Sequence, residues 1–436
     1  MMQRDYLRRL ALLCLMLLGS GALAGAQQPT LPVIHTEHGP NSAAAMKAHY
    51  VVLVSLDGFR WDYAKKYGAT HLLALGKRGV WAPEGMLPSY PSLTFPNHYA
   101  IATGLYPEHN GLVANSFYDE GKQARYAISD AKAVTDGTWY SGTPLWSLAE
   151  SQGMRSACLF WPGSEAKIAG ELPSEYLHFD DKVDEEARIG QVIAWLKESA
   201  TTRPHFITLY YSDVDHAGHE FGPDAPETRT AAVKLDGLVG RLRGALTATR
   251  LPVDLVVVSD HGMVKVEGPW VTLDEFADLT GFDAAGPLLY GKTEEDRARV
   301  YDKLKRASEK FQVYRLKDVP AGLHYNENPR EGDPVVVATG PYAIRAHAPP
   351  AGGRPDGPPS VGAHGYDPRA MPEMKASFFA AGPDIVRGKT VAPFENVNIY
   401  PWIAHILGLT APKTDGDLNI LAGTLKDGGA EPSPKE

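Results

Sequence analysis

Aspartate and histidine residues occur close together at several places in the sequence, with a spacing that suits metal binding. In the segment Asp215-His216-Ala217-Gly218-His219, Asp215 and His219 are four residues apart and would face one side of a helix or turn. A solvated loop rich in Asp and His would explain this segment equally well. Asp260-His261-Gly262 is more informative, because it follows an apolar run, where a buried charge is costly unless a cation or partner compensates it.

Two further residues complete a pool of six possible metal ligands. Asp57 ends the apolar run 50–56, and His364 is flanked by Gly362 and Gly365. Such a mixed N/O set suits two Zn²⁺ ions, with Mn²⁺ as an alternative, and each four-coordinate ion then needs one more oxygen from water, substrate or a nucleophile. The pool consists of Asp57, Asp215, Asp260, His219, His261 and His364.

Thr94 is the best candidate for a nucleophile that supplies such an oxygen. It lies in the segment 91–99, and a threonine followed two residues later by Pro96 is typical of a helix start. We expect Thr94 to be the N-cap of this helix, with its alkoxide stabilised by the helix dipole and the metal. Capping alone would also explain the threonine, and Ser89 and Ser92 are competing hydroxyls with less convincing helix starts after them.

Short apolar runs without alternation are the strands expected to position these residues. Runs of this kind are typical of strands covered on both faces, as in a parallel sheet. They lie at residues 50–56, 156–160, 206–211 and 255–259. Open α/β sheets bind their ligands beyond the carboxyl ends of the strands, so Asp57 and Asp260 can converge although they are far apart in the sequence.

Helical patterns lie between these runs. The clearest has apolar residues at helical spacing, namely Leu235, Leu238, Val239, Leu242 and Leu246. The alternation of strand and helix predicts a three-layer α/β/α sandwich with a mostly parallel central sheet. The stretch from about 265 to 345 interrupts this rhythm with a charged helix near 293–310 and strands near 312–314 and 335–337, so we expect a small α+β insertion beside the site.

The first 26 residues have the order of a secretory signal. Three arginines precede the apolar run Leu10 to Leu18, and small residues follow it. The run is too short to be a stable membrane anchor. We expect cleavage after Ala24 or Ala26 and an exported protein, periplasmic or secreted. Cys14 would be lost with this signal, which leaves Cys158 as a buried strand thiol and no disulfide in the mature chain.

Composition places the chain among globular proteins. Its 436 residues are 44% hydrophobic and 22% charged, with a formal charge of −9. This acidic balance argues against a general nucleic-acid coat protein. We expect a flexible lead-in over 27–47, a catalytic domain over 48–422 and a frayed tail over 423–436, with the Gly/Pro-rich segment 349–363 as a surface loop.

Six motifs appear in an order that resembles the nucleotide pyrophosphatase/phosphodiesterase family of the alkaline phosphatase superfamily, in its bacterial single-domain form. They are residues 56–60 (LDGFR), 91–99 (PSLTFPNHY), 103–107 (TGLYP), 160–165 (FWPGSE), 215–219 (DHAGH) and 259–262 (SDHG). The resemblance covers roughly 48–422 and implies an alkaline phosphatase-like fold with two zinc ions. One ion would be held by Asp215, His219 and His364, and the other by Asp57, Asp260 and His261 together with Thr94.

The same resemblance assigns residues to the substrate. Asn115 and the backbone N–H of Phe95 would hold a phosphoryl oxygen, and the rings of Phe95 and Tyr210 would sandwich a nucleobase, with Tyr176 as a further candidate for that pocket. The chain departs from the family pattern at Val214, where a proline usually precedes the metal-binding aspartate.

The resemblance implies hydrolysis of nucleotide phosphodiester and pyrophosphate bonds through a nucleotidyl-threonine intermediate, releasing nucleoside 5′-monophosphates. Because the metal activates the hydroxyl, no Ser-His-Asp relay is needed, and His98 is expected to be structural. A lipid-headgroup phosphodiesterase and a phosphate monoesterase of the same superfamily are alternatives, and an exported protein that only binds metal or nucleotide is a third. The sequence leaves the preferred nucleobase, the leaving group and the oligomeric state open.

Overall fold

The computed structural model describes residues 31–348 and 359–430. The expected signal at 1–26 lies outside these residues, as do most of the expected loop 349–363 and the last six residues of the expected tail. All that follows concerns the compact unit Val33–Glu436. Within the described ranges, no helix has the length and apolar character needed to cross a bilayer.

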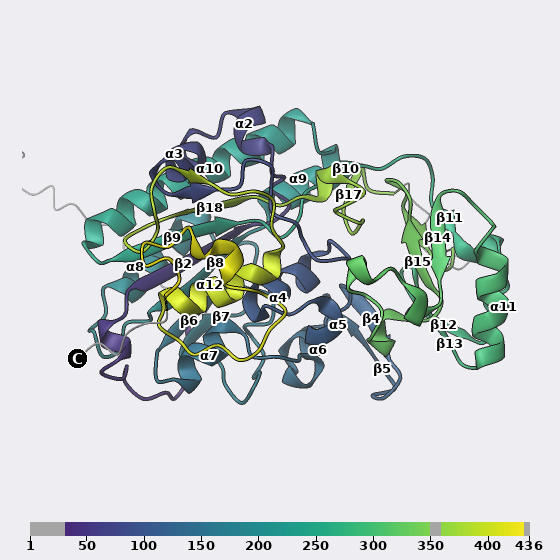
Figure 1. Cartoon of the computed structure of the whole chain (residues 1–436), viewed down its shortest axis with the longest axis horizontal. Helices are drawn as coiled ribbons and strands as arrows, with labels where there is room; N and C mark the ends of the chain where they lie inside the picture. Colours follow the sequence, from purple (N-terminus) through teal and green to yellow (C-terminus); the bar gives the residue numbers. More distant parts are fainter. Residues whose placement is uncertain (1–30, 349–358, 431–436) are drawn as a thin grey trace, which may run out of the picture. The chain divides into compact units, whose positions relative to one another are not determined.

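A nine-stranded sheet forms the centre of this unit (Figure 1). Its five consecutive parallel strands lie in the order β7 (Glu175–Leu177), β6 (Ser156–Leu159), β8 (Phe206–Tyr211), β2 (Tyr50–Leu56) and β9 (Val253–Val258). Flanking strands are β1 (Ile34–His35), β18 (Phe378–Ala381), β3 (Val80–Trp81) and β19 (Lys389–Thr390), with β1 and β18 antiparallel to the neighbouring parallel strands. All four expected strands are therefore present, and the mostly parallel sheet is confirmed.

Burial on both faces explains why the central strands are apolar throughout. Every residue of β2 and β8 is buried. Pairing places Ser55 beside Tyr210 on one side and beside Val258 on the other, so that β8, β2 and β9 end at the same edge of the sheet. Residues that directly follow these three strands must therefore lie close together.

Helices cover both faces of the sheet (Figure 1). One layer contains α2 (Tyr63–Tyr67), α3 (Thr70–Arg78) and α10 (Pro226–Thr249), and the other contains α4 (Thr94–Thr103), α7 (Leu145–Ser151) and α12 (Ile399–Ile406). The five apolar residues expected to form one face of a helix are all buried on α10. Together with the sheet, these layers confirm the three-layer sandwich.

The segment expected to be an insertion has its own small hydrophobic core. It contains α11 (Glu294–Leu304) and antiparallel pairs of β12 (Phe282–Ala285) with β13 (Leu288–Gly291) and of β14 (Phe311–Tyr314) with β15 (Val335–Ala338). The helix ends at Leu304, six residues earlier than expected. Val300 and Leu304 are its buried residues, and no apolar face continues beyond them to hold a longer helix against this core.

Both ends of the unit are more ordered than the sequence suggested. The expected flexible lead-in contains β1, which pairs with β7, and its Asn41 side chain donates to the carbonyls of Ala200 and Arg203. The expected frayed tail is packed as far as Leu425, since Thr424 accepts a hydrogen bond from the Trp402 indole. Both corrections have one cause, which is that buried polar groups here find partners distant in sequence.

Glu331 is an acidic side chain in the interior with no ion-pair partner among the residues that the structure describes. It is fully buried, and neither carboxylate oxygen has a hydrogen-bond partner among the described residues. Burial, and then the nearby charge of Glu108, raises the pKa of Glu331 to about 9. The folded protein therefore holds a proton on Glu331 at neutral pH, whereas the unfolded chain does not.

This proton makes stability depend on pH. Because the folded pKa lies above the unfolded one, the contribution of Glu331 is most favourable below pH 4.5 and worsens as the pH rises towards 9. Between pH 6 and pH 8 we expect the free energy of unfolding of Glu331→Gln to rise by about 3 kcal/mol relative to wild type, since each of the two pH units is worth about 1.4 kcal/mol. Urea denaturation at pH 6 and at pH 8 measures the free energy of unfolding of both proteins. The exposed Glu84→Gln is the control, and an equal change in both variants would contradict the assignment.

Candidate active site

The structure brings all seven expected metal-site residues to the carboxyl edge of the sheet. Asp57 follows β2, Asp260 and His261 follow β9, and α9 (Asp213–Phe221), which follows β8, carries Asp215 and His219. Thr94 begins α4. His364 follows β17 (Gly362–Ala363), whose pairing with β10 (Val264–Lys265) carries it next to His261.

The first cluster is centred on the Nε2 atom of His261. This atom lies 2.9 Å from Asp260 Oδ2, 3.5 Å from Asp57 Oδ1 and 3.3 Å from the Thr94 hydroxyl. Both carboxylates and the imidazole are buried, while Thr94 is partly exposed. The hydroxyl therefore stands at the open side of the cluster, where a substrate can reach it.

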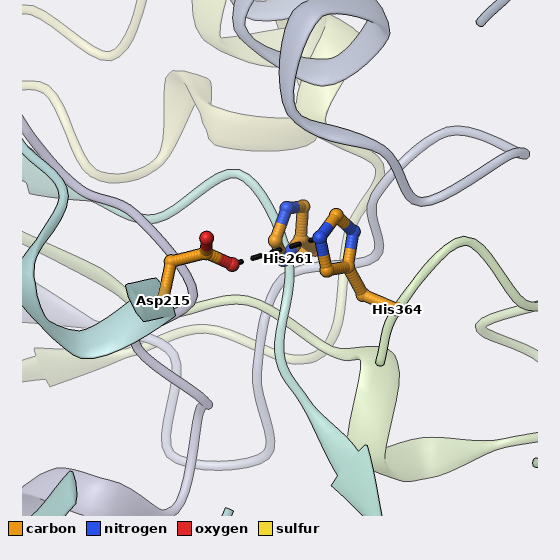
Figure 2. A group of neighbouring side chains, drawn as sticks. All are labelled: Asp215, His261 and His364. Atoms are coloured by element: carbon orange, nitrogen blue, oxygen red, sulfur yellow. Dashed lines mark ion pairs between the residues drawn. The ribbon is translucent and has the colours of Figure 1, made fainter. Parts of the chain in front are cut away.

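The second cluster is a triangle of Asp215, His219 and His364. Asp215 Oδ1 lies 3.5 Å from His219 Nε2 and 3.6 Å from His364 Nε2, and the two nitrogens are 3.1 Å apart. Figure 2 shows the side chains of Asp215, His261 and His364 pointing toward one another. The rings of His261 and His364 stack with centroids 3.6 Å apart, so the two clusters are direct neighbours.

The three histidines all present Nε2 to the clusters, because backbone carbonyls fix their other nitrogen. The Nδ1 atom of His219 donates to the carbonyl of Gly362, that of His364 donates to the carbonyl of Ser92, and that of His261 donates to the carbonyl of Gly262, at 2.8–3.0 Å. A carbonyl can only accept, so Nε2 keeps its lone pair, which is the form that binds metals.

A glycine makes one of these contacts possible. A Cβ on Gly362 would lie 2.3 Å from the Gly218 carbonyl, so only glycine lets β17 pass this close to α9.

The unsatisfied atoms of the site are those that a cation would bind. Asp57 Oδ1, Asp215 Oδ1 and Asp260 Oδ2 are buried without a hydrogen-bond partner among the described residues. Burial, followed by the charges of Asp260 and Asp215, raises the pKa of Asp57 well above its usual range. Facing lone pairs and uncompensated carboxylates are unfavourable without positive charge between them, so both clusters fit divalent cations.

The cap expected at Thr94 is wrong. Leu93 is the N-cap of α4, Thr94 is the first helical residue, and no side chain caps the helix. The helix start turns the hydroxyl toward His261 instead of back onto the backbone amides. The hydroxyl is thus free for chemistry and still lies at the positive end of the helix dipole.

The sequence did not predict that Tyr210 and His98 contact the carboxylates. The Tyr210 hydroxyl donates to Asp57 Oδ2 at 2.6 Å. His98 is fully buried, with Nδ1 3.3 Å from Asp260 Oδ2 and Nε2 2.8 Å from the Ser55 hydroxyl. These contacts agree with a structural His98, and only the position of Ser55, two residues before Asp57 on β2, could have signalled its role.

Asn115 lies beside the helix start. Its Oδ1 accepts a hydrogen bond of 3.0 Å from the backbone N–H of Phe95, and the residue is partly exposed. The two groups expected to hold a phosphoryl oxygen are thus in contact. A bound oxygen would take over the Phe95 N–H that Asn115 now engages.

The aromatic residues expected around a nucleobase are largely buried, whereas a neighbouring ring is exposed. Tyr210 is 7% exposed and Tyr176, on β7, is also 7% exposed. Phe179, which the sequence analysis did not select, is 50% exposed and contacts the Tyr210 ring edge-on at 6.0 Å. Glu165 holds this segment, because it accepts from the Phe179 N–H and from His178.

The chain is similar to known phosphodiesterases over most of its length. The family described as type I phosphodiesterase/nucleotide pyrophosphatase matches residues 51–367. The chain belongs to this family. An uncharacterised pyrophosphatase/phosphodiesterase of Schizosaccharomyces pombe is 34% identical over 84% of the chain and 78% of its own length. Human ectonucleotide pyrophosphatase/phosphodiesterase family member 7 is 31% identical over 88% of the chain and 85% of its own length.

Solved structures support the alkaline phosphatase-like fold of this family. Murine ectonucleotide pyrophosphatase/phosphodiesterase 5 superposes with a TM-score of 0.80 at 30% identity and covers 86% of this chain and 100% of its own. An inactive threonine-to-alanine variant of that mouse protein has been solved in complex with AMP (TM-score 0.80, 29% identity, 87% of this chain and 100% of its own). The chain spans about half (47%) of a venom phosphodiesterase of Crotalus durissus collilineatus.

Two histidines on α9 test the metal assignment. His219 points into the second cluster, whereas His216, three residues before it on the same helix, is exposed. We expect His219→Ala to lose about one divalent ion per chain and most phosphodiesterase activity, because the cluster then lacks one of its three ligands. His216→Ala should retain the bound ion and the phosphodiesterase activity. Metal analysis after equilibration with zinc measures the difference, and equal metal content in the two variants would count against the cluster.

Proposed function

We propose that this enzyme hydrolyses nucleotide phosphodiester and pyrophosphate bonds through a covalent nucleotidyl-threonine intermediate and releases nucleoside 5′-monophosphates. One observation carries the proposal, which is the partly exposed Thr94 hydroxyl at the helix start, 3.3 Å from His261 Nε2 and beside the buried carboxylates. The AMP complex of the inactive threonine variant of the mouse relative supports it.

The residues of the site would act in two displacements. In the first, Thr94 Oγ1 forms a bond to the α-phosphorus, the bond from phosphorus to the leaving oxygen breaks, and the hydroxyl proton departs. In the second, water attacks the same phosphorus, the bond to Thr94 breaks, and the hydroxyl regains a proton. Two Zn²⁺ ions, one at Asp57, Asp260 and His261 with Thr94 and one at Asp215, His219 and His364, would lower the pKa of the attacking oxygens and offset phosphoryl charge.

Asn115 and the Phe95 N–H would hold a non-bridging phosphoryl oxygen. Their present contact of 3.0 Å puts both groups at the N-terminus of α4, where the helix dipole favours negative charge. His98 would act by positioning. Its Nδ1 faces the carbonyl of Thr94 and Asp260 Oδ2, which ties the helix start to the carboxylate.

Replacement of the hydroxyl tests the nucleophile. Thr94→Ala should lower kcat by at least about 10³-fold, since the first displacement loses its attacking atom, while zinc stays bound. Thr94→Ser is the matched control and should keep measurable turnover. Intact-mass spectrometry of rapidly quenched wild type should show one added nucleotidyl group that Thr94→Ala lacks. Normal turnover in Thr94→Ala would refute the nucleophile.

We also propose that Phe179 forms part of the wall that receives the organic group of the substrate, beside Phe95 and Tyr210. The Phe179 ring is exposed and lies next to Tyr210, which supports this role. Tyr210 is itself buried and donates its hydroxyl to Asp57, so it offers less open surface than Phe179. Tyr176 remains a proposed neighbour of the pocket. Stacking on a base is worth roughly 1–3 kcal/mol, so an exposed aromatic ring here would favour nucleotides over substrates without a base.

Phe179→Ala should therefore raise KM about tenfold for a dinucleoside polyphosphate, a change of about 1.4 kcal/mol. It should raise KM for bis(p-nitrophenyl) phosphate less, because a single nitrophenyl ring offers a smaller stacking surface than a nucleobase. Steady-state kinetics on both substrates make the comparison. A lysophospholipid and p-nitrophenyl phosphate complete the panel, and a higher kcat/KM on either would favour the lipid-headgroup or monoesterase alternative.

Export belongs to the same proposal. The charged, apolar and small-residue order of residues 1–26 supports a cleaved signal and a periplasmic or secreted enzyme. The intact mass of the mature protein distinguishes cleavage after Ala24 from cleavage after Ala26, and an uncleaved chain recovered from the cytoplasm would refute export.

A further inference from the structure

A second group of side chains that could bind a metal lies at the amino-terminal ends of the central strands, on the opposite side of the sheet from the active site. His49 directly precedes β2, and Asp254 is the second residue of β9. Asp384 follows β18, which is antiparallel to β9 and therefore ends where β9 begins. The strands β2 and β9 thus carry candidate ligands at both ends. We call His49, Asp254 and Asp384 the distal cluster.

The distal cluster is compact. One ligand atom from each of its residues lies within 4.8 Å of the other two. His49 Nδ1 is 2.7 Å from Asp384 Oδ2, and the Asp384 backbone N–H donates to Asp254 Oδ1 at 3.1 Å. A Cβ on Gly382 would lie 2.2 Å from Asp254 Oδ1, so the chain wraps closely around this carboxylate.

Asp254 is the observation that points to a ligand. It is fully buried, and its Oδ2 has no hydrogen-bond partner among the described residues. Burial, followed by the charge of Asp384, raises the pKa of Asp254 to about 8. Two carboxylates this close, one of them desolvated, repel each other unless a proton or a cation lies between them.

We propose that the distal cluster is a binding site for a divalent cation of the zinc or manganese type. One imidazole and two carboxylates form the mixed N/O set that these ions accept, and they offer too few oxygens for calcium. His49 and Asp384 are each 35% exposed in their side chains and line a cavity of about 830 Å³, through which the ion and its water ligands can enter.

The position of the site indicates its role. Asp254 and Asp260 are six residues apart along β9 and the turn after it, which corresponds to about 20 Å. An ion at the distal cluster is therefore too far away to take part in the reaction at Thr94. It would join the starts of β2 and β9 to the segment after β18 and stabilise the sheet at this edge.

Metal content is the direct test. Wild type, Asp384→Asn and Asp427→Asn are freed of metal, equilibrated with excess zinc, desalted and measured for bound zinc per chain. Asp427 lines the same cavity and is 54% exposed, so Asp427→Asn is the matched control. We expect Asp384→Asn to bind one zinc fewer than the other two and to keep wild-type phosphodiesterase activity. Equal zinc content in all three would overturn the proposal.

Wild-type crystals give a second reading that does not depend on the variants folding. An anomalous peak at the zinc edge among His49, Asp254 and Asp384 would establish the site, and the absence of a peak after a zinc soak would overturn it. A shared proton is the competing account. It predicts that Asp254→Asn is more stable than wild type at pH 8 with unchanged zinc content, and this result would also overturn the proposal.

Discussion

Three buried carboxylates at the ends of neighbouring strands are the constraint around which the structure is built. Asp57, Asp215 and Asp260 each leave one oxygen without a hydrogen-bond partner among the described residues, and these oxygens point at the Nε2 atoms of three histidines. Removing such charges from water costs several kcal/mol per ion unless positive charge compensates them. The fold accepts this cost at the cluster that we propose holds cations and a phosphoryl group.

The rest of the structure keeps that cluster rigid. Parallel pairing of β8, β2 and β9 aligns the strand ends, and the buried His98 and Tyr210 fix the carboxylates from behind. Backbone carbonyls fix the three histidine rings. Groups of this second layer typically change metal affinity by about 10–100-fold, which makes them part of the site although they are not metal ligands themselves.

The sheet also explains how one scaffold carries two separate polar clusters. A strand has two ends, and in β2 and β9 both ends hold ligating side chains, with an apolar, fully packed middle between them. The carboxyl end faces the substrate, whereas the distal end faces a cavity lined by His49 and Asp384.

The sequence by itself determined the strands, the fold class and the six Asp and His side chains that meet at the strand ends, because apolar runs and the residues at their ends are local signals. It also pointed to Thr94, but it predicted this residue as the N-cap of the helix, whereas Thr94 is the first residue of α4. Only the tertiary structure decided that Tyr210 bonds Asp57, that Phe179 is the exposed aromatic beside it, and that His49, Asp254 and Asp384 meet. These contacts join residues from different strands and loops, and their side chains meet only once the crossover connections have set the order of the strands.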